Sequence, residues 1–111
     1  MPEQSELSTE DRKLVTLARA TRARTGAADG AAVRDLDGRT YAGATVDLPS
    51  LQVSAIGVCV AMAVASGSKG LEAVVVLTDA AEADAADLAA VKEFAGEGVP
   101  VIVGDPRGNL R

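Results

Sequence analysis

The segment Glu72–Thr78 constrains the fold more than any other part of the sequence. It reads Glu-Ala-Val-Val-Val-Leu-Thr, an almost uninterrupted run of aliphatic residues in which the β-branched type prevails. A strand with one solvated face alternates apolar and polar residues, whereas a strand covered on both faces is apolar throughout. The run therefore predicts a central strand with helices packed on both faces of its sheet.

Periodicity, caps and turn residues place the other elements around this strand. Ser8 followed by Asp11 resembles a capping box, and Asp37-Gly38 between two short strand-like segments is typical of a hairpin. The expected elements are a helix from Ser8 to about Arg24, strands at 31–35 and 40–46, a helix at Ser50–Ala65, the strand at Glu72–Thr78, a helix at Asp84–Ala95 and a strand at Val99–Val103. The helix at Ser50–Ala65 is apolar on every face, which predicts that it is buried and central. This order predicts an α/β fold, a three-layer α-β-α sandwich with a mixed sheet of four to five strands.

Length and composition indicate one globular domain spanning residues 1–111, with residues 1–6 expected to be flexible. Apolar residues make up 48% of the chain, but aromatic residues only 2%, namely Tyr41 and Phe94. The core must therefore be built from closely packed Ala, Val, Leu and Ile.

Charge and hydropathy exclude several classes of partner. The net charge of −5 argues against nucleic acid, and the basic residues of the first helix are interpreted as a solvated face. The longest apolar stretch, Val53–Ala65, is shorter than the roughly 20 residues of a membrane span. The polar start of the sequence shows no export signal, so we expect a cytoplasmic protein without membrane contact. Cys59 is the only cysteine, which rules out an intrachain disulfide.

Few side chains in the sequence favour catalysis. The chain has no histidine, which removes the commonest general base and metal ligand. The loop at 66–70, Ser-Gly-Ser-Lys-Gly, follows a helix and precedes a strand, the reverse of a phosphate-binding loop. Cys59 lies in an apolar segment and is interpreted as a core residue rather than a nucleophile. Carboxylates gather before and within the start of the helix at 84–95, and we interpret them as helix caps, with a hard-cation site as the alternative: Asp79, Glu82, Asp84 and Asp87.

From Gly26 onward the chain resembles the cytidine deaminases of the small, homotetrameric, nucleoside-acting kind. The resemblance rests on ungapped spacing rather than on one motif. The matching residues are Gly26, Gly30-Ala31-Ala32, Asp37-Gly38-Arg39, Tyr41, Gly43 and Val46, followed by Ser50 and by Glu93-Phe94. It implies the cytidine deaminase-like fold, and it implies a homo-oligomer, either a dimer or a tetramer.

The same resemblance implies that the residues of the family's zinc site have been replaced. When the chain is aligned with the family as this resemblance implies, Ile56 takes the position of the first zinc ligand and Val58 that of the proton-transferring glutamate. Asp84 and Asp87 take the positions of the two cysteines of the family. Aliphatic side chains neither coordinate zinc nor carry a proton, and two carboxylates do not complete a zinc site. Thr45 and Asp47 take the positions of the family's ribose-binding Asn and Glu.

We therefore expect a pseudoenzyme without cofactor, acting as a binding or assembly module with another protein or with copies of itself. Two alternatives stay open. One is a sensor that binds a nucleoside or other small molecule through Thr45 and Asp47 without chemistry. The other is an active deaminase with an atypical metal site at Asp84 and Asp87, with Cys59 as a further ligand.

Overall fold

The computed structural model describes residues 7–111, so the flexibility expected of residues 1–6 lies outside the described residues. The elements are α1 (Thr9–Thr25), β1 (Gly30–Asp35), β2 (Thr40–Ala44), β3 (Val46–Leu48), β4 (Leu51–Val53), α2 (Ala55–Ala65), β5 (Leu71–Leu77), α3 (Ala85–Ala95) and β6 (Val101–Gly104). Four strands form the main sheet in the order β2-β1-β5-β6, with β5 and β6 parallel and the other neighbours antiparallel. The expected mixed sheet of four to five strands is thus confirmed with four.

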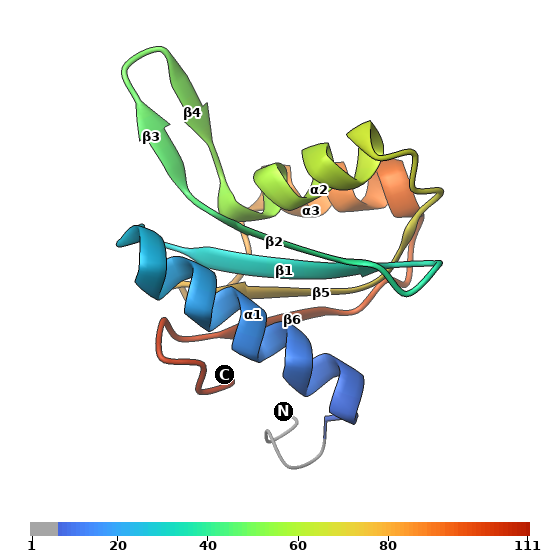
Figure 1. Cartoon of the computed structure of the whole chain (residues 1–111), viewed down its shortest axis with the longest axis horizontal. Coiled ribbons are helices and arrows are strands. Elements are labelled where there is room, and N and C mark those ends of the chain that lie inside the picture. Colours follow the sequence, from blue (N-terminus) through green and yellow to red (C-terminus); the bar gives the residue numbers. More distant parts are fainter. Residues whose placement is uncertain (1–6) are drawn as a thin grey trace.

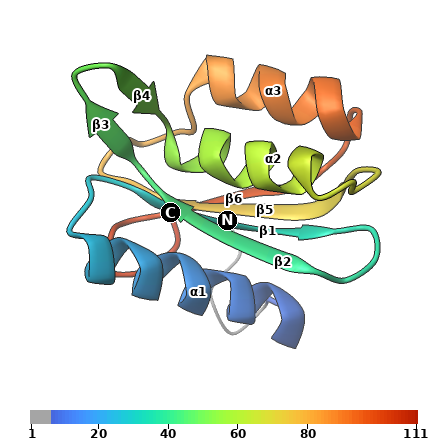
Figure 2. The same cartoon turned by 45° about the horizontal axis from the view of Figure 1, so that its top comes forward.

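Helices cover both faces of this sheet, as the apolar β5 run predicts. Helix α1 lies on one face, and α2 and α3 lie on the other (Figure 2). Along β5, Val74 and Val76 pack with α2 and α3, whereas Ala73, Val75 and Leu77 pack with α1. Because successive strand residues point to opposite faces, one strand supplies the centre of both cores. The expected three-layer sandwich is confirmed.

Helix α1 begins as the sequence predicts. Ser8 is its N-cap, and its Oγ accepts a hydrogen bond from the backbone N–H of Asp11 at 3.0 Å. The buried face of α1 consists of Leu14, Val15, Ala18 and Thr21. The helix lies so close to β1 that a Cβ at Gly30 would collide with the carbonyl oxygen of Ala18, so glycine is required there.

The expected helix at Ser50–Ala65 was wrong in two respects. First, it begins only at Ala55, because Leu51–Val53 is a strand that pairs with Val46–Leu48 in a separate hairpin around Pro49 and Ser50. This β3–β4 hairpin projects from the body of the molecule (Figure 1). Second, the helix is not buried on every face, since only Ala55, Ile56, Cys59 and Ala63 are buried. An apolar sequence alone did not distinguish a core helix from a helix whose outer side lies at the surface.

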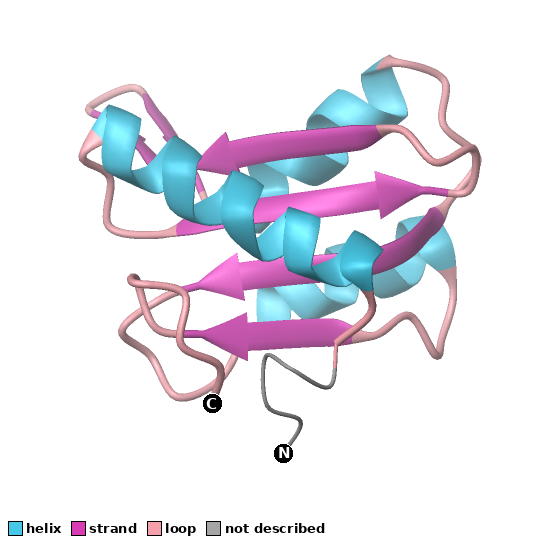
Figure 3. Cartoon of the chain, turned by 60° about the horizontal axis from the view of Figure 1, so that its bottom comes forward, coloured by secondary structure: helices cyan, strands magenta, loops and turns pink. Residues whose placement is uncertain are grey.

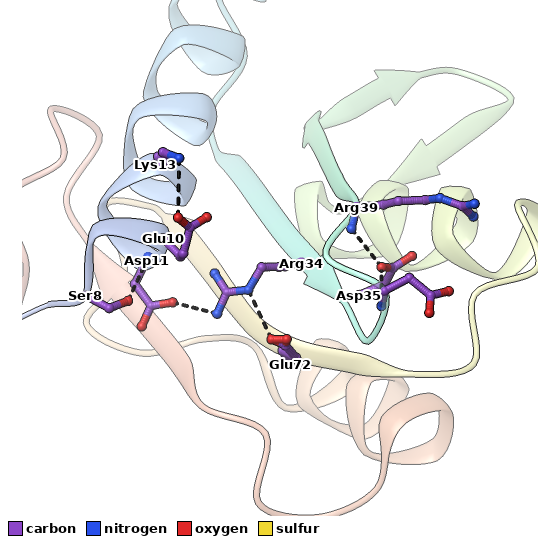
Figure 4. A network of polar contacts seen from close by, with 9 residues as sticks. Ser8, Glu10, Asp11, Lys13, Arg34, Asp35, Arg39 and Glu72 are labelled. Carbon is purple, nitrogen blue, oxygen red and sulfur yellow. Dashed lines mark hydrogen bonds and ion pairs between the residues drawn. The ribbon is translucent and has the colours of Figure 1, made fainter.

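A buried carboxylate secures one end of the sheet. Asp35, at the end of β1, accepts hydrogen bonds from Ser68 Oγ at 2.5 Å and from the backbone N–H groups of Asp37 and Arg39 at 2.9 Å each. The hydroxyl of Tyr41 lies 3.2 Å from Ser68 Oγ and completes the cluster. Figure 4 shows the contact between Asp35 and Arg39. The hydrogen bond from Ser68 is the main reason that the pKa of Asp35 lies below its usual value, although burial opposes the shift.

We predict that Asp35→Ala lowers the melting temperature at pH 7 by on the order of 10 °C, because it leaves buried donors without an acceptor. A carboxylate with a lowered pKa stabilises the fold above its unfolded-state pKa, and this contribution is lost as the pH falls through the folded-state value. The difference in melting temperature between the wild type and Asp35→Ala should therefore narrow below about pH 4. Thermal melts followed by circular dichroism at several pH values measure it. Asp37→Ala, which removes an exposed carboxylate from the same turn, is the matched control; an equal loss in both variants would contradict the role given to Asp35.

Candidate functional site

One pocket brings together four residues that the sequence singled out in two distant segments, namely Ile56, Glu82, Asp84 and Asp87. It has a volume of about 210 Å³ and lies where the end of β5 meets the N-terminal ends of α2 and α3. Its lining residues are Asp29, Ile56, Val76, Thr78, Ala80, Glu82, Ala83, Asp84 and Asp87. Ile56, Asp84 and Asp87 are therefore neighbours in space, as the register of the resemblance requires.

The N-cap of α3 lines this pocket, and the N-cap of α2 lies behind it through a contact with Asp87. Ser54 caps α2 by accepting a hydrogen bond from the N–H of Gly57 at 2.9 Å, and Asp84 caps α3 by accepting one from Ala86 at 2.8 Å. Ser54 Oγ also donates a hydrogen bond of 2.6 Å to Asp87 Oδ1, which joins the two helices. Ser54 was not predicted as a site residue, although a serine directly before an apolar helical segment is a typical N-cap. Asp29 was not predicted either, because no local pattern marks it.

The two aliphatic replacements have different surroundings. Ile56 is 1% exposed and belongs to the core between α2 and the sheet, with its edge at the pocket. Val58 does not line the pocket but packs on strand β2, where a Cβ at Gly43 would lie 2.9 Å from Val58 Cγ1. Neither side chain offers a lone pair or a titratable proton to a molecule in the pocket.

The two candidate ligand-binding residues do not meet in the pocket. Thr45 pairs with Asp29, because its Oγ1 accepts the N–H of Asp29 at 3.0 Å and its own N–H donates to the carbonyl of Asp29 at 3.1 Å. Thr45 thereby holds one pocket-lining residue without lining the pocket itself. Asp47 lies on the projecting hairpin strand β3, exposed and away from the lining residues.

Cys59 lies one turn further along α2 and outside the pocket. It is fully buried, its thiol donates to the carbonyl of Tyr41 at 3.6 Å, and burial raises its pKa to about 12. A thiol with such a pKa is protonated at neutral pH and is neither a nucleophile nor a good metal ligand.

The donor set at the pocket does not fit a catalytic zinc ion. Such a site requires three protein ligands of the N, S or O type converging on one point. In residues 7–111, no group of three or more His, Cys, Asp or Glu side chains is arranged to hold a metal ion. The pocket instead presents Thr78 and the carboxylates of Asp29, Glu82, Asp84 and Asp87, with no basic side chain among its lining residues. This arrangement favours cationic over anionic ligands and offers no activated nucleophile.

We predict that Ser54→Ala lowers the free energy of unfolding by about 1–3 kcal/mol, because it removes both a helix cap and a hydrogen bond to a carboxylate. Ser8→Ala is the matched control, since Ser8 caps α1 in the same way but contacts no carboxylate. Urea denaturation of both variants measures the difference. A loss no larger for Ser54→Ala than for Ser8→Ala would contradict a stabilising link between α2 and α3 through Asp87.

Comparison with known proteins identifies the family and the fold of the chain. A family model described as cytidine deaminase-like matches residues 7–108. No curated protein matches the chain. Among solved structures, cytidine deaminase from Burkholderia pseudomallei superposes with a TM-score of 0.80 at 20% identity, covering 95% of this chain and 91% of that chain. The enzyme from Mycobacterium leprae gives a TM-score of 0.71 at 21% identity, covering 94% and 93%.

Cytidine deaminase from Mycobacterium tuberculosis is similar to the same degree, with a TM-score of 0.71 at 20% identity over 94% of this chain and 90% of that chain. At these identities the superpositions establish the fold, while the family model covers nearly the whole described chain. Within residues 7–111, no helix has the length and apolarity needed to cross a bilayer. The chain belongs to the cytidine deaminase-like family.

Proposed function

We propose that the chain is a non-catalytic cytidine deaminase-like domain that acts as an assembly module, pairing with further copies of itself through helix α2. The observation that carries the proposal is the sequence of α2, Ala-Ile-Gly-Val-Cys-Val-Ala-Met-Ala-Val-Ala, which has no ionisable side chain other than the buried thiol. This helix bears both the register positions of the family's catalytic residues and an apolar outer side.

The pocket supports the loss of catalysis. Deamination in this family needs a zinc-bound water and a carboxylate that moves protons. Three residues stand at the register positions of zinc ligands, and the pocket gathers all three, Ile56, Asp84 and Asp87. The match of register and geometry supports the view that this is the former metal pocket. The side chain of Ile56 cannot coordinate a metal in this pocket, and Val58, which packs on strand β2, cannot transfer a proton.

The outer side of α2 supports an assembly role. Val64 is 53% exposed on this helix, and the β3–β4 hairpin beside the start of α2 exposes Leu48 by 55% and Leu51 by 53% (Figure 1). Burying a valine or leucine side chain contributes about 1.5–3 kcal/mol, so an interface over this surface would be favourable. A second copy is the occupant we propose, because the family that the chain resembles assembles from identical subunits.

We predict that the protein purified without added metal carries well below one zinc per chain and releases no ammonia from cytidine. Elemental analysis and a deamination assay on the same sample measure this. Stoichiometric zinc with turnover would contradict the proposal. In that case Asp84→Asn and Asp87→Asn variants would show whether the carboxylates hold the metal.

The retained pocket favours a second candidate function, a small-molecule sensor without chemistry. A ligand that binds only the folded state raises the melting temperature, and the rise grows with the logarithm of the ligand concentration above the dissociation constant. A cytidine-dependent rise that is lost in Thr45→Ala and Asp47→Ala variants would favour a sensor that binds through these two residues. A rise that persists in both variants and is lost in Asp87→Asn would favour a sensor that binds in the pocket.

We predict that the wild-type protein elutes as a dimer or tetramer of the 11.2 kDa chain, measured by size-exclusion chromatography with light scattering. A Leu51→Glu, Val64→Glu variant should elute as a monomer, because charged side chains are not tolerated in a buried apolar interface. Ala20→Glu adds a carboxylate to an exposed position of α1 on the opposite face and should leave the mass unchanged. A monomeric wild type, or an unchanged mass in the double variant, would contradict assembly through α2.

A further inference from the structure

The outward face of α1 carries a concentration of positive charge that the proposed function does not use. Five of the eleven basic residues of the chain lie on this helix, and from Arg12 to Ala28 the sequence contains no acidic residue. Arg12, Thr16, Arg19 and Ala23 follow one another at spacings of three or four residues and form one row, while Lys13, Ala20 and Arg24 form the next. All seven are exposed.

The acidic residues of α1 offset only part of this charge. Asp11 turns toward the sheet, where its carboxylate lies 3.0 Å from the guanidinium of Arg34, and Arg34 also contacts Glu72 at 3.3 Å (Figure 4). Glu10 pairs with Lys13 at 3.3 Å. Among the ion pairs of residues 7–111, none involves the exposed arginines 12, 19 and 24.

A turn near the C-terminus adds a further arginine beside α1. A Cβ built on the buried Gly108 would lie 3.4 Å from Val15 Cγ1 and 3.6 Å from Arg19 Cδ, so the turn packs on the helix. The carboxylate of Asp105 closes the turn by accepting the N–H groups of Arg107 at 2.9 Å and Asn109 at 3.0 Å. Arg107 is exposed in this fixed turn. We call the surface made by Arg12, Lys13, Arg19, Arg24 and Arg107 the cationic face.

The fold separates this face from much of the negative charge of the chain. The sheet lies between α1 and the helices α2 and α3 (Figure 2), and Figure 3 shows α1 crossing the sheet with its outer side uncovered by the drawn elements. The carboxylates on α3 and its flanking loops are Asp79, Glu82, Asp84, Asp87, Glu93 and Glu97. Of these, Asp79 lines a hollow together with Arg22 and Arg107, at the edge of the α1 side. The net charge of −5, which led the sequence analysis to argue against nucleic acid, is therefore an average over two unlike sides.

The residues between the cations indicate the kind of partner. Thr16, Ala20 and Ala23 are small, and Leu17, which lines a hollow beside Arg12 and Lys13, is partly buried against the core. The face therefore lacks a large exposed apolar side chain of the sort that protein interfaces bury at their centre. A polyanion needs only cations at close range, and arginine binds phosphate oxygens through two parallel hydrogen bonds. The face has no aromatic side chain on which unpaired bases could stack, which favours a duplex over a single strand.

The height to which α1 protrudes from the sheet indicates whether it can contact B-form DNA or A-form RNA. Its buried face fixes it along the sheet, so only about half of its diameter of roughly 10 Å stands clear of the surface. That is too little to reach the floor of a B-form major groove, which is about 8.5 Å deep. The minor groove of A-form RNA is wide and shallow and presents phosphates and 2′-hydroxyls to a flat surface. The exposed cations from Arg12 to Arg24 span about 18 Å along the helix, enough to contact several phosphates. We propose that the cationic face binds the phosphate backbone of duplex RNA.

The test uses the full chain and a fluorescein-labelled RNA duplex of about 20 base pairs, with binding followed by anisotropy. With four phosphate contacts, affinity should fall on the order of a hundredfold between 50 and 200 mM KCl. A triple variant, Arg12→Gln, Arg19→Gln and Arg24→Gln, should bind at least about tenfold more weakly at 50 mM KCl and show a shallower salt dependence. Circular dichroism confirms that the variant is folded.

The matched control removes three exposed cations from other surfaces, Arg39→Gln, Lys69→Gln and Lys92→Gln, and so changes the net charge equally. It should reduce affinity less than threefold. The proposal is overturned if the wild type does not bind the RNA duplex at 50 mM KCl, or if the control loses as much affinity as the α1 variant. Equal or tighter binding of a DNA duplex of the same sequence would contradict the groove argument, and equally tight binding of poly-glutamate would assign the face to an acidic protein.

Discussion

The burial of strand β5 on both faces is the constraint on which the rest of the structure depends. Its residues point alternately to α1 and to the pair α2 and α3, so neither helical layer can be removed without exposing half of the strand. Because the chain has almost no aromatic residues, these layers must approach the sheet closely to fill the core. Gly30 shows how close the approach is, since only a residue without a side chain fits beneath α1 at that point. The pocket therefore lies on the α2 and α3 side of the sheet, at one end of β5, and the cationic face lies on the outer side of α1, across the sheet.

The sequence predicted the parts of the fold whose cause is local. Ser8 and Asp11 begin α1, Asp37-Gly38 forms a turn between two strands, and the aliphatic run at Glu72–Thr78 contains a central strand, all as expected. The β3–β4 hairpin was not predicted, because Leu51 and Val53 continue the apolar character of the following helix. Apolar character distinguishes neither a short strand from a helical turn nor a core helix from a surface helix.

Only some of the residues at the candidate site were predicted from the sequence. Ile56, Asp84 and Asp87 were brought together only through the spacing of the family resemblance, and the structure places all three at one pocket. Ser54 was missed because the helix was expected to begin at Ser50, which placed the N-cap inside the helix. Asp29 was missed because its contact with Thr45 spans 16 positions. The proposed cationic face could not be predicted from the net charge, since a net value does not record which side of a sheet a residue occupies. Contacts over such distances follow from the tertiary structure and leave no local pattern in the sequence.

The central claim is that the pocket between α2 and α3 is a metal site that has lost its ligands while keeping its geometry. Its most direct test is to restore sulfur ligands with Ile56→Cys, Asp84→Cys and Asp87→Cys in one chain and to measure zinc by elemental analysis, with Ile56→Cys alone as the control. Three thiolates converging on one point bind zinc tightly. The account predicts one zinc per chain in the folded triple variant and none above background in the wild type or the single variant. A folded triple variant without zinc, or stoichiometric zinc in the wild type, would contradict it.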